Sequence, residues 1–408
     1  MPFYLLYWGI GGTMQEILRR YARLIIEIQL KLQGGDALSI NTESSTMAFA
    51  RMLATMACES THQTVTIVET NHGKIAQTLE FDPVEHRIKR PEITGYVMCH
   101  LVDLDNAPYV TDENVFSAAE EVTKLATYGL LSDPVFLDQR IAVPWANIPL
   151  PGPLWAMQLL GKAASEEEMW TLFSKLYRLE DDHGLKFWND QSNLLQYRKQ
   201  VLNKKGKLQL DIKGECCTLQ ATTADRTKWT GGSSVISSGR TFLPSLPMQH
   251  IHASLDMHKT EGTIKALRPF LLLGKVVEEA TFTIEKGKVV SYNAKQNKEA
   301  LDAYFAVDEG ASVVSGLSLA DNDTIESRYL SQAIHPHFNR EITGSLVLGG
   351  FNLNTLTDQS TDEEIDASKL GRSLVRLEIP IGSDSLSIQA TDEQGNKSVI
   401  MDEGVVEL

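Results

Sequence analysis

The chain has few cysteines, and none of them is spaced for a metal or redox motif. Four occur among 408 residues, Cys58, Cys99, Cys216 and Cys217, and no two of them form a Cys-x-x-Cys pair. Disulfide-stabilised secreted domains and thiolate zinc sites both need denser or regularly spaced cysteines. The cysteine content therefore argues against these two classes and predicts reduced thiols in a cytoplasmic protein.

Basic residues are also in short supply. The chain has 38 Lys and Arg against 53 Asp and Glu, which gives a formal net charge of -15 and an isoelectric point near 5.2. A chain of this charge repels phosphate groups, so we expect neither a nucleic acid nor an anionic membrane as a partner.

Long hydrophobic runs are missing as well. The apolar start from Met1 to Ile10 is too short to span a bilayer, and no basic residue precedes it as in a signal peptide. Residues 1–13 show no helical or strand period. We therefore expect them either to be disordered or not to belong to the native protein, with Met14 as the alternative start.

The residues that are present predict two domains, the first of them α/β. A chain of 408 residues with 42% hydrophobic and 22% charged residues is globular and too long for one compact core. Helix and strand patterns alternate in its first half, which predicts an open, mostly parallel sheet in a domain of residues 14–205. The helices are expected at 15–32, 47–58 and near 113–128, and the strands at 37–41 and 64–69.

A proline-rich segment at 143–156 interrupts this alternation. Proline lacks a backbone N–H and fixes φ, so the segment predicts neither a regular helix nor a central strand, and we interpret it as a connection. Beyond it, Ser165 and Glu168 form a capping-box pattern that starts a helix, and another helix is expected over 192–203.

The C-terminal half has a β-rich pattern. Beyond Gly206, short segments rich in β-branched residues are separated by turn residues, at 208–212, 217–221, 280–284, 289–293 and 374–379. The pattern predicts a mainly antiparallel, β-rich α+β domain over residues 206–408.

Several segments of this half occur in a recognisable order. They include Gly239-Arg-Thr-Phe-Leu-Pro-Ser-Leu-Pro-Met-Gln-His-Ile-His-Ala-Ser-Leu-Asp256, Lys259-Thr-Glu-Gly-Thr263, Asp308-Glu-Gly-Ala311, 338–349 and Val375-Arg-Leu-Glu-Ile-Pro-Ile-Gly382. The order and spacing of these segments resemble those of the aminopeptidase S, aminopeptidase T and PepS family of thermophilic metalloaminopeptidases. The resemblance covers about residues 14–408 of the chain. The resemblance implies an α/β N-terminal domain, a β-rich catalytic domain and a homodimer.

The resemblance also implies a two-metal peptidase site. Two divalent ions such as Zn, Co or Mn would polarise the scissile carbonyl and lower the pKa of a bridging water, while a carboxylate accepts the proton. The family places a Glu before Val-Phe-Thr, a Glu after the Asp-Glu-Gly-Ala anchor, a Glu and a His in Phe-Asp-Glu-Asn-Ala-Ala-Cys-His, and a His and an Asp in its final strand. The corresponding residues here are, in the same order, His250, Gly316, Arg340, Ser345, Arg376 and Glu378.

The replaced set carries the wrong charge for two metal ions. Four carboxylates would give about -4, whereas two arginines and one glutamate sum to about +1 with His250 neutral. A guanidinium about 4 Å from a divalent ion is repelled by on the order of 8 kcal/mol at an effective dielectric of about 20. We therefore expect no cofactor and an inactive protein with a binding, regulatory or structural role. Arg340 and Arg376 are expected to pair with Glu378 or to bind a peptide or another anionic small ligand.

A rearranged metal site is the alternative. His250 and His252 form one His-x-His pair, His335 and His337 form a second, and Glu341 follows. Imidazole and carboxylate groups are common ligands of divalent metals. These five residues would then hold the metal of an active aminopeptidase that removes N-terminal residues from peptides.

Overall fold

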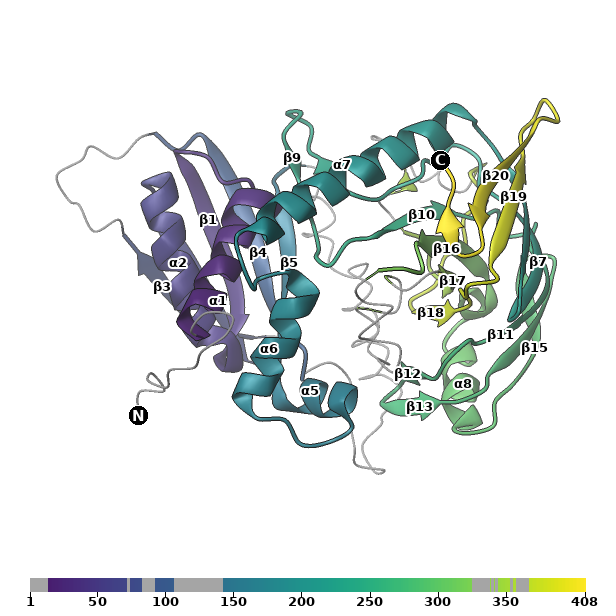
Figure 1. Cartoon of the computed structure of the whole chain (residues 1–408), viewed down its shortest axis with the longest axis horizontal. Helices are drawn as coiled ribbons and strands as arrows, with labels where there is room; N and C mark the ends of the chain where they lie inside the picture. The colour runs from purple at the N-terminus through teal and green to yellow at the C-terminus, as the bar shows by residue number, and fades with distance from the viewer. Residues whose placement is uncertain are drawn as a thin grey trace. The chain divides into compact units, whose positions relative to one another are not determined.

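The computed structural model describes residues 14–71, 74–82, 92–105, 142–324, 338, 341, 344–352, 355–356 and 367–408. Residues 1–13 and the helix expected near 113–128 lie outside this part of the chain. The described residues form two compact units (Figure 1). The first contains the described residues up to 105 together with 142–192 and 233–248, and the second contains 193–232 and those from 249 to 408.

The first unit contains a five-stranded sheet in the order β3-β2-β1-β4-β5. Strand β1 is parallel to both β2 and β4, and β4 is parallel to β5, whereas β3 is antiparallel to β2. This arrangement confirms the predicted open, mostly parallel sheet. The strand bounds are β1 Asp36–Glu43, β2 Val65–Asn71, β3 Lys74–Phe81, β4 Gly95–Asp103 and β5 Trp145–Leu150.

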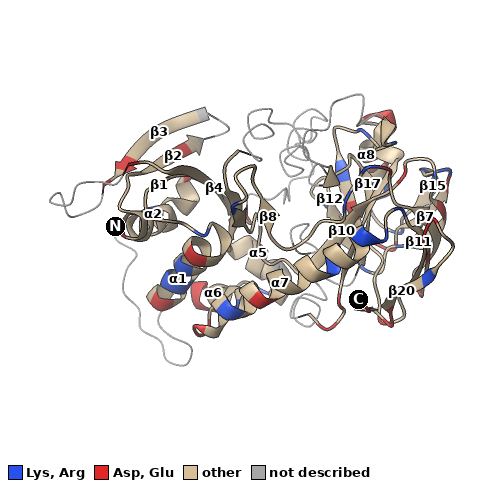
Figure 2. Ribbon diagram, turned by 90° about the horizontal axis from the view of Figure 1, so that it is seen from above, with Lys and Arg blue, Asp and Glu red and all other residues tan. Residues whose placement is uncertain are grey.

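Helices α1 (Met14–Arg23), α2 (Met47–Thr61) and α6 (Glu166–Tyr177) lie on one face of this sheet (Figures 1 and 2). Tyr21 of α1 is fully buried between them and donates a hydrogen bond of 2.7 Å to the carbonyl of Pro149 in β5. Its ring lies 5.3 Å from that of Phe49 and 5.2 Å from that of Phe173, measured between centroids. The helix expected over 15–32 continues beyond α1 as a π-helical turn, Leu24–Gln29, rather than as regular α-helix.

The proline-rich segment is more regular than its sequence predicts. It contains strand β5 at the edge of the sheet and the start of α5 (Pro153–Leu160), so the expectation that it forms no regular helix was wrong. Proline is compatible with both positions because an edge strand need not donate every ladder hydrogen bond and the first helical residue has no intrahelical N–H partner. Pro153 occupies this first helical position.

Two helices follow α5. The predicted capping box is confirmed at α6, where Glu168 N donates to Ser165 Oγ at 3.2 Å and Ser165 N donates to Glu168 Oε2 at 2.9 Å. Helix α7 spans His183–Lys204 and so begins nine residues before the expected position of 192. None of the described helices is both long enough and apolar enough to cross a membrane.

Residues 233–248 return to the first unit from beyond the predicted boundary at 205/206. Arg240 donates two hydrogen bonds to the buried carboxylate of Asp36, with Nη1–Oδ1 at 2.9 Å and Nη2–Oδ2 at 2.7 Å. Asn147 N donates to the carbonyl of Pro244 at 2.8 Å, and Leu243 N donates to that of Gln29 at 2.7 Å. These contacts join residues distant in sequence, which explains why local patterns did not place the segment. It also carries the short hairpin of β8 (Ser234–Val235) and β9 (Thr241–Phe242).

The second unit is built from two antiparallel sheets, as predicted for a β-rich domain. One sheet has eight strands in the order β15-β14-β11-β7-β6-β19-β20-β21, and the other has four in the order β10-β16-β17-β18. In the eight-stranded sheet the bounds are β6 Gln209–Gly214, β7 Cys217–Thr222, β11 Glu261–Lys265, β14 Thr281–Glu285, β15 Lys288–Asn293, β19 Ser387–Thr391, β20 Lys397–Asp402 and β21 Val405–Val406. In the four-stranded sheet they are β10 His250–Ser254, β16 Val314–Ala320, β17 Gly344–Gly349 and β18 Arg376–Pro380.

Smaller elements complete this unit. They are β12 Phe270–Leu272, β13 Lys275–Val277, α8 Lys298–Phe305 and a 3-10 turn at Glu309–Ser312. The C-terminal part of α7 is tied to the sheets by Arg198, which forms a bidentate ion pair with Asp321 at 2.8 and 3.1 Å. Asp321 also accepts a hydrogen bond from Val406 N at 2.9 Å, so one carboxylate joins the helix to the last strand.

Candidate functional site

The residues that the resemblance aligns with metal ligands of the family gather on one face of the four-stranded sheet. His252 lies directly opposite Ser318, and Ser318 lies opposite Ser345. Val347, two residues after Ser345, lies opposite Glu378. Because opposite residues and alternate residues along a strand share a face, these pairings place all the described positions on the same side. We call this surface the inherited face, defined by His250, Gly316, Ser345, Arg376 and Glu378; Arg340 lies outside the described residues.

His252 fills the space above Gly316. A Cβ atom built on Gly316 would lie 2.6 Å from His252 Cε1 and 2.9 Å from Nε2, which is closer than van der Waals contact allows. The imidazole is buried and is held from its other side by Ser318 Oγ, 2.9 Å from Nδ1. A glutamate at position 316 would therefore collide with this ring.

Arg376 and Glu378 form an ion pair on β18. Arg376 Nη2 donates to Glu378 Oε1 at 3.1 Å, and each side chain is 13% exposed. The pairing that the sequence predicts for these two residues is therefore present. It engages the only carboxylate among the described positions of the inherited face.

His250 pairs with Glu341 instead of standing as a separate ligand. His250 Nδ1 lies 2.8 Å from Glu341 Oε1, and Gln249 N donates to Oε2 of the same carboxylate at 2.6 Å. Glu341 is almost completely buried and His250 is mostly buried. Both carboxylate oxygens thus have partners inside the protein, as a buried charge requires.

Tyr304 of α8 reaches the same sheet, although no motif singled it out. Its hydroxyl donates to the carbonyl of Leu348 in β17 at 3.1 Å. Burial raises the pKa of Tyr304 well above its ordinary value, nearby Asp308 raises it further, and Arg376 opposes this rise. The phenol is therefore neutral at physiological pH and serves as a hydrogen-bond donor.

Asp308 fixes the start of β18. Its carboxylate accepts hydrogen bonds from Ala311 N, Ser373 Oγ and Leu374 N, each at 2.8 Å. The Asp-Glu-Gly-Ala motif thus has a structural role here, since its aspartate holds the segment that leads into Arg376.

The donor set of the inherited face does not fit a two-metal centre. Such a centre needs several carboxylates, one of them shared between the ions. The described positions supply one imidazole and one carboxylate, and Arg376 lies within 3.1 Å of the latter. Within the described part of the chain, no group of three or more His, Cys, Asp or Glu side chains is placed to hold an ion. His335 and His337 of the alternative site lie outside that part.

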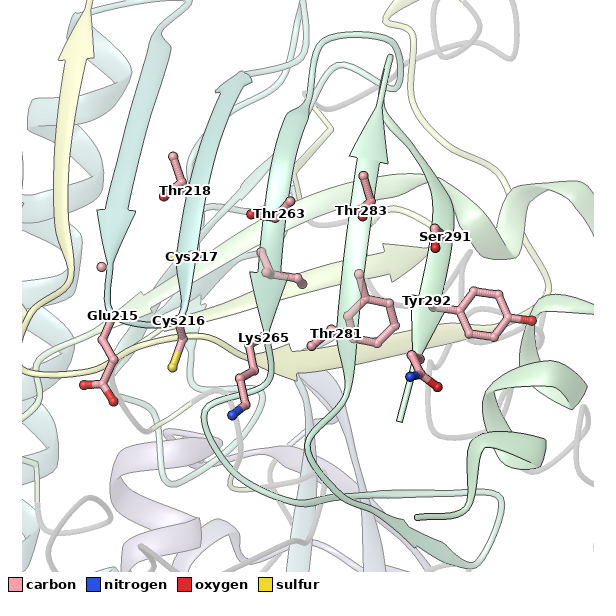
Figure 3. A pocket seen from close by; sticks show the side chains of 14 residues that line it. Glu215, Cys216, Cys217, Thr218, Thr263, Lys265, Thr281, Thr283, Ser291 and Tyr292 are labelled. Atoms are coloured by element: carbon pink, nitrogen blue, oxygen red, sulfur yellow. The ribbon is translucent and has the colours of Figure 1, made fainter. Parts of the chain in front are cut away.

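A separate concavity lies on the eight-stranded sheet (Figure 3). It has a volume of about 350 Å³ and includes a cross-strand row of hydroxyl groups on Thr218, Thr263, Thr283 and Ser291. Cys216 also lines it; burial raises the pKa of this thiol, Glu215 adds to the rise, and Lys265 opposes it. The lining can hydrogen-bond a polar molecule but contains no histidine to act as a base.

Comparisons with known proteins identify relatives along nearly the whole chain. Residues 14–406 match the model of the family described as thermophilic metalloprotease (M29). Aminopeptidase 2 of Geobacillus stearothermophilus is 23% identical over 410 residues, which cover 96% of this chain and 97% of the relative. Aminopeptidase T of Thermus aquaticus is 22% identical over 418 residues, which cover 95% of this chain and 98% of the relative.

The fold has a counterpart among solved structures. Wild-type AmpT from Thermus thermophilus aligns with a TM-score of 0.79 at 19% identity, covering 97% of this chain and all of the other. The predicted architecture of an α/β domain followed by a β-rich domain is confirmed. The expectation that the protein has no cofactor was wrong, because the family whose model matches is one of metalloproteases. This match over residues 14–406 shows that the chain belongs to the thermophilic metalloprotease family M29.

Proposed function

We propose that this protein binds peptides at the inherited face and does not hydrolyse them there. The observation that carries the proposal is the ion pair between Arg376 and Glu378, 3.1 Å apart at two positions where the resemblance implies metal ligands. A guanidinium in contact with the remaining carboxylate opposes a divalent ion at that place by several kcal/mol, of order 8 at about 4 Å and a dielectric of about 20.

The geometry around Gly316 supports the same proposal. The ring of His252 occupies the space that a glutamate side chain would need, and Ser318 holds that ring in place. Restoring the carboxylate would require the buried imidazole to move, so the loss at position 316 is built into the packing of the sheet.

Peptide binding follows from the residues that remain. An arginine fork can bind a second carboxylate while it retains the first, because its N–H groups point in several directions. The relatives are named aminopeptidases, and their substrates are peptides. A short peptide, or another anionic small molecule that presents a carboxylate, is thus the class of ligand that we assign to this face.

A second candidate function is metal-dependent removal of N-terminal residues. One observation favours it: Glu341 contacts Nδ1 of His250, which leaves the opposite ring nitrogen, Nε2, oriented by a buried carboxylate. Metal-binding histidines commonly have such a partner on their second nitrogen. His250 would then hold the ion with His252, His335 or His337, and Glu341 would orient the ligand instead of binding the metal. A bound ion would polarise the scissile carbonyl.

Two measurements on the purified full chain separate these functions. The first is hydrolysis of an aminoacyl p-nitroanilide with zinc, cobalt or manganese added, and the second is calorimetric binding of a tripeptide. We expect peptide binding without turnover, and we expect Arg376→Met to abolish binding while Arg372→Met, an exposed arginine just before β18, retains it. Metal-dependent turnover that His250→Ala abolishes would instead establish the second function.

The proposal extends to a homodimer in the cytoplasm. The resemblance implies the dimer, and the four cysteines, all buried as thiols, suit a reducing compartment. Sedimentation of the purified protein at several concentrations tests the oligomer, and a single species of monomer mass at all concentrations would contradict it.

A further inference from the structure

An apolar groove runs between the first two helices of the chain. It has a volume of about 730 Å³ and lies far from the inherited face in sequence. We call it the α1–α2 groove, and it is lined by Gln15, Arg19, Met47, Ala48, Arg51, Met52, Thr55, Met56 and Glu59. Its size is that of a site for a small ligand or a few side chains of a peptide.

Methionines form the floor of this groove. Met47, Met52 and Met56 are half-buried, whereas the polar residues around them are exposed. Methionine side chains are flexible and polarisable, and they line surfaces that accept apolar side chains of varied shape. The arginines on the rim, Arg19 and Arg51, can lay their aliphatic stems along an apolar occupant while their charged groups remain in water.

The chain itself supplies a matching segment immediately before the groove. Residues 1–13 precede α1, and Gln15, the second residue of that helix, lines the groove. The segment contains the continuous apolar and aromatic run Phe3-Tyr4-Leu5-Leu6-Tyr7-Trp8 and has no charged side chain. Leaving such a run in water forfeits about 25 cal/mol for each Å² of apolar surface that could be buried.

The connection allows the run to reach the groove. Gly11 and Gly12 separate it from α1, and glycine adopts the backbone conformations that a reversal of direction needs. The six Cα–Cα steps from Trp8 to Met14 span at most about 20 Å when the chain is extended. We propose that the N-terminal run, residues 3–8 of this same chain, docks in the α1–α2 groove and covers its methionines.

Methyl NMR of methionine-labelled protein tests the docking directly. The full chain is compared with a chain that starts at Met14, and the signals are assigned by Met→Leu substitution. We expect the signals of Met47, Met52 and Met56 to differ between the two proteins. The signal of Met157, exposed on α5 in the same unit, is the matched control and should stay in place.

A substitution in the segment keeps the test independent of helix folding. Trp8→Ser in the full chain should move the three groove signals towards their positions in the truncated protein and lower the Tm by about 2–4 °C. Identical groove signals in all three proteins would overturn the proposal. Differences that disappear on dilution would also overturn it, because they would assign the groove to a second copy of the chain.

Discussion

The imidazole of His252 lies where the side chain of a residue at position 316 would begin. A Cβ on Gly316 would be 2.6 Å from His252 Cε1, so any larger residue there requires this ring to move. The ring in turn is held by Ser318, two residues along the same strand as Gly316. The packing of a neighbouring histidine thus explains why position 316 holds a glycine.

Gly316→Ala is expected to destabilise the second unit by about 1–3 kcal/mol, because the added methyl group forces His252 out of its packed position. Combining it with His252→Ala should cost less than the sum of the two single changes, since the small side chain makes room. Urea unfolding of the four proteins measures this coupling. Gly34→Ala is the control, because that glycine has open space around it, and strict additivity would contradict the proposed contact.

Arg198→Met should cost about 3–5 kcal/mol of unfolding free energy, because it leaves the carboxylate of Asp321 without the arginine that neutralises it. Adding Asp321→Leu should recover part of the loss. Urea unfolding monitored by circular dichroism gives the values. Lys186→Met, which breaks an exposed pair with Asp190 on the same helix, should leave the midpoint unchanged.

Glu378→Gln should strengthen the binding of a tripeptide carboxylate about tenfold, because the guanidinium of Arg376 loses its negative partner and attracts the ligand more strongly. Calorimetric titration of the full chain measures the change in affinity. Adding Arg376→Met to the Glu378→Gln variant should remove this gain in affinity. Weaker binding by Glu378→Gln would mean that Glu378 itself contacts the peptide.

Lys199 should make the second unit more stable as the pH rises. Burial lowers the pKa of Lys199 from 10.5 to about 8 in the folded protein, and the nearby Lys228 adds to this shift. Between these two pH values the unfolded chain binds more protons at this residue than the folded chain does. Its contribution to stability therefore increases through this interval, by about 3 kcal/mol in total.

Lys199→Met isolates this effect. Urea unfolding at pH 7.5 and at pH 10 should show that the difference in stability between the variant and the natural protein shrinks at the higher pH. Lys204→Met, an exposed lysine on the same helix, should show no such convergence. A constant difference for both variants would disprove the assignment to Lys199.

Much of the fold was predictable because it depends on local patterns. The alternation of helix and strand predicted the mostly parallel sheet, and the spacing of Ser165 and Glu168 predicted the cap of α6. The proline-rich segment was misjudged because proline is excluded from the centre of a sheet or helix but not from an edge strand or the first turn. The position of β5 as the last strand of the sheet, next to β4, is a tertiary feature that the local sequence does not reveal.

The contacts within the candidate site could not be predicted from the sequence. The order of the motifs located His250, Gly316, Ser345, Arg376 and Glu378 in the sequence, and strand register places them on one face. Ser318 carried no signal beyond its place in an alternating strand, although it holds His252. Sequence also offered Glu341 as a metal ligand, whereas in the structure it contacts His250 and the backbone of Gln249.

The sequence by itself determined the family, the two kinds of domain and the residue types at the positions of the family's motifs, because these depend on residue identity, order and short-range periodicity. The tertiary structure alone decided which of those residues touch: that His252 covers Gly316, that Glu341 faces His250, and that Arg240 ties a distant segment to Asp36. Some of these contacts join neighbouring strands of one sheet, and the contact between Arg240 and Asp36 joins residues 204 positions apart. Their geometry follows from strand register and burial, which no local pattern encodes.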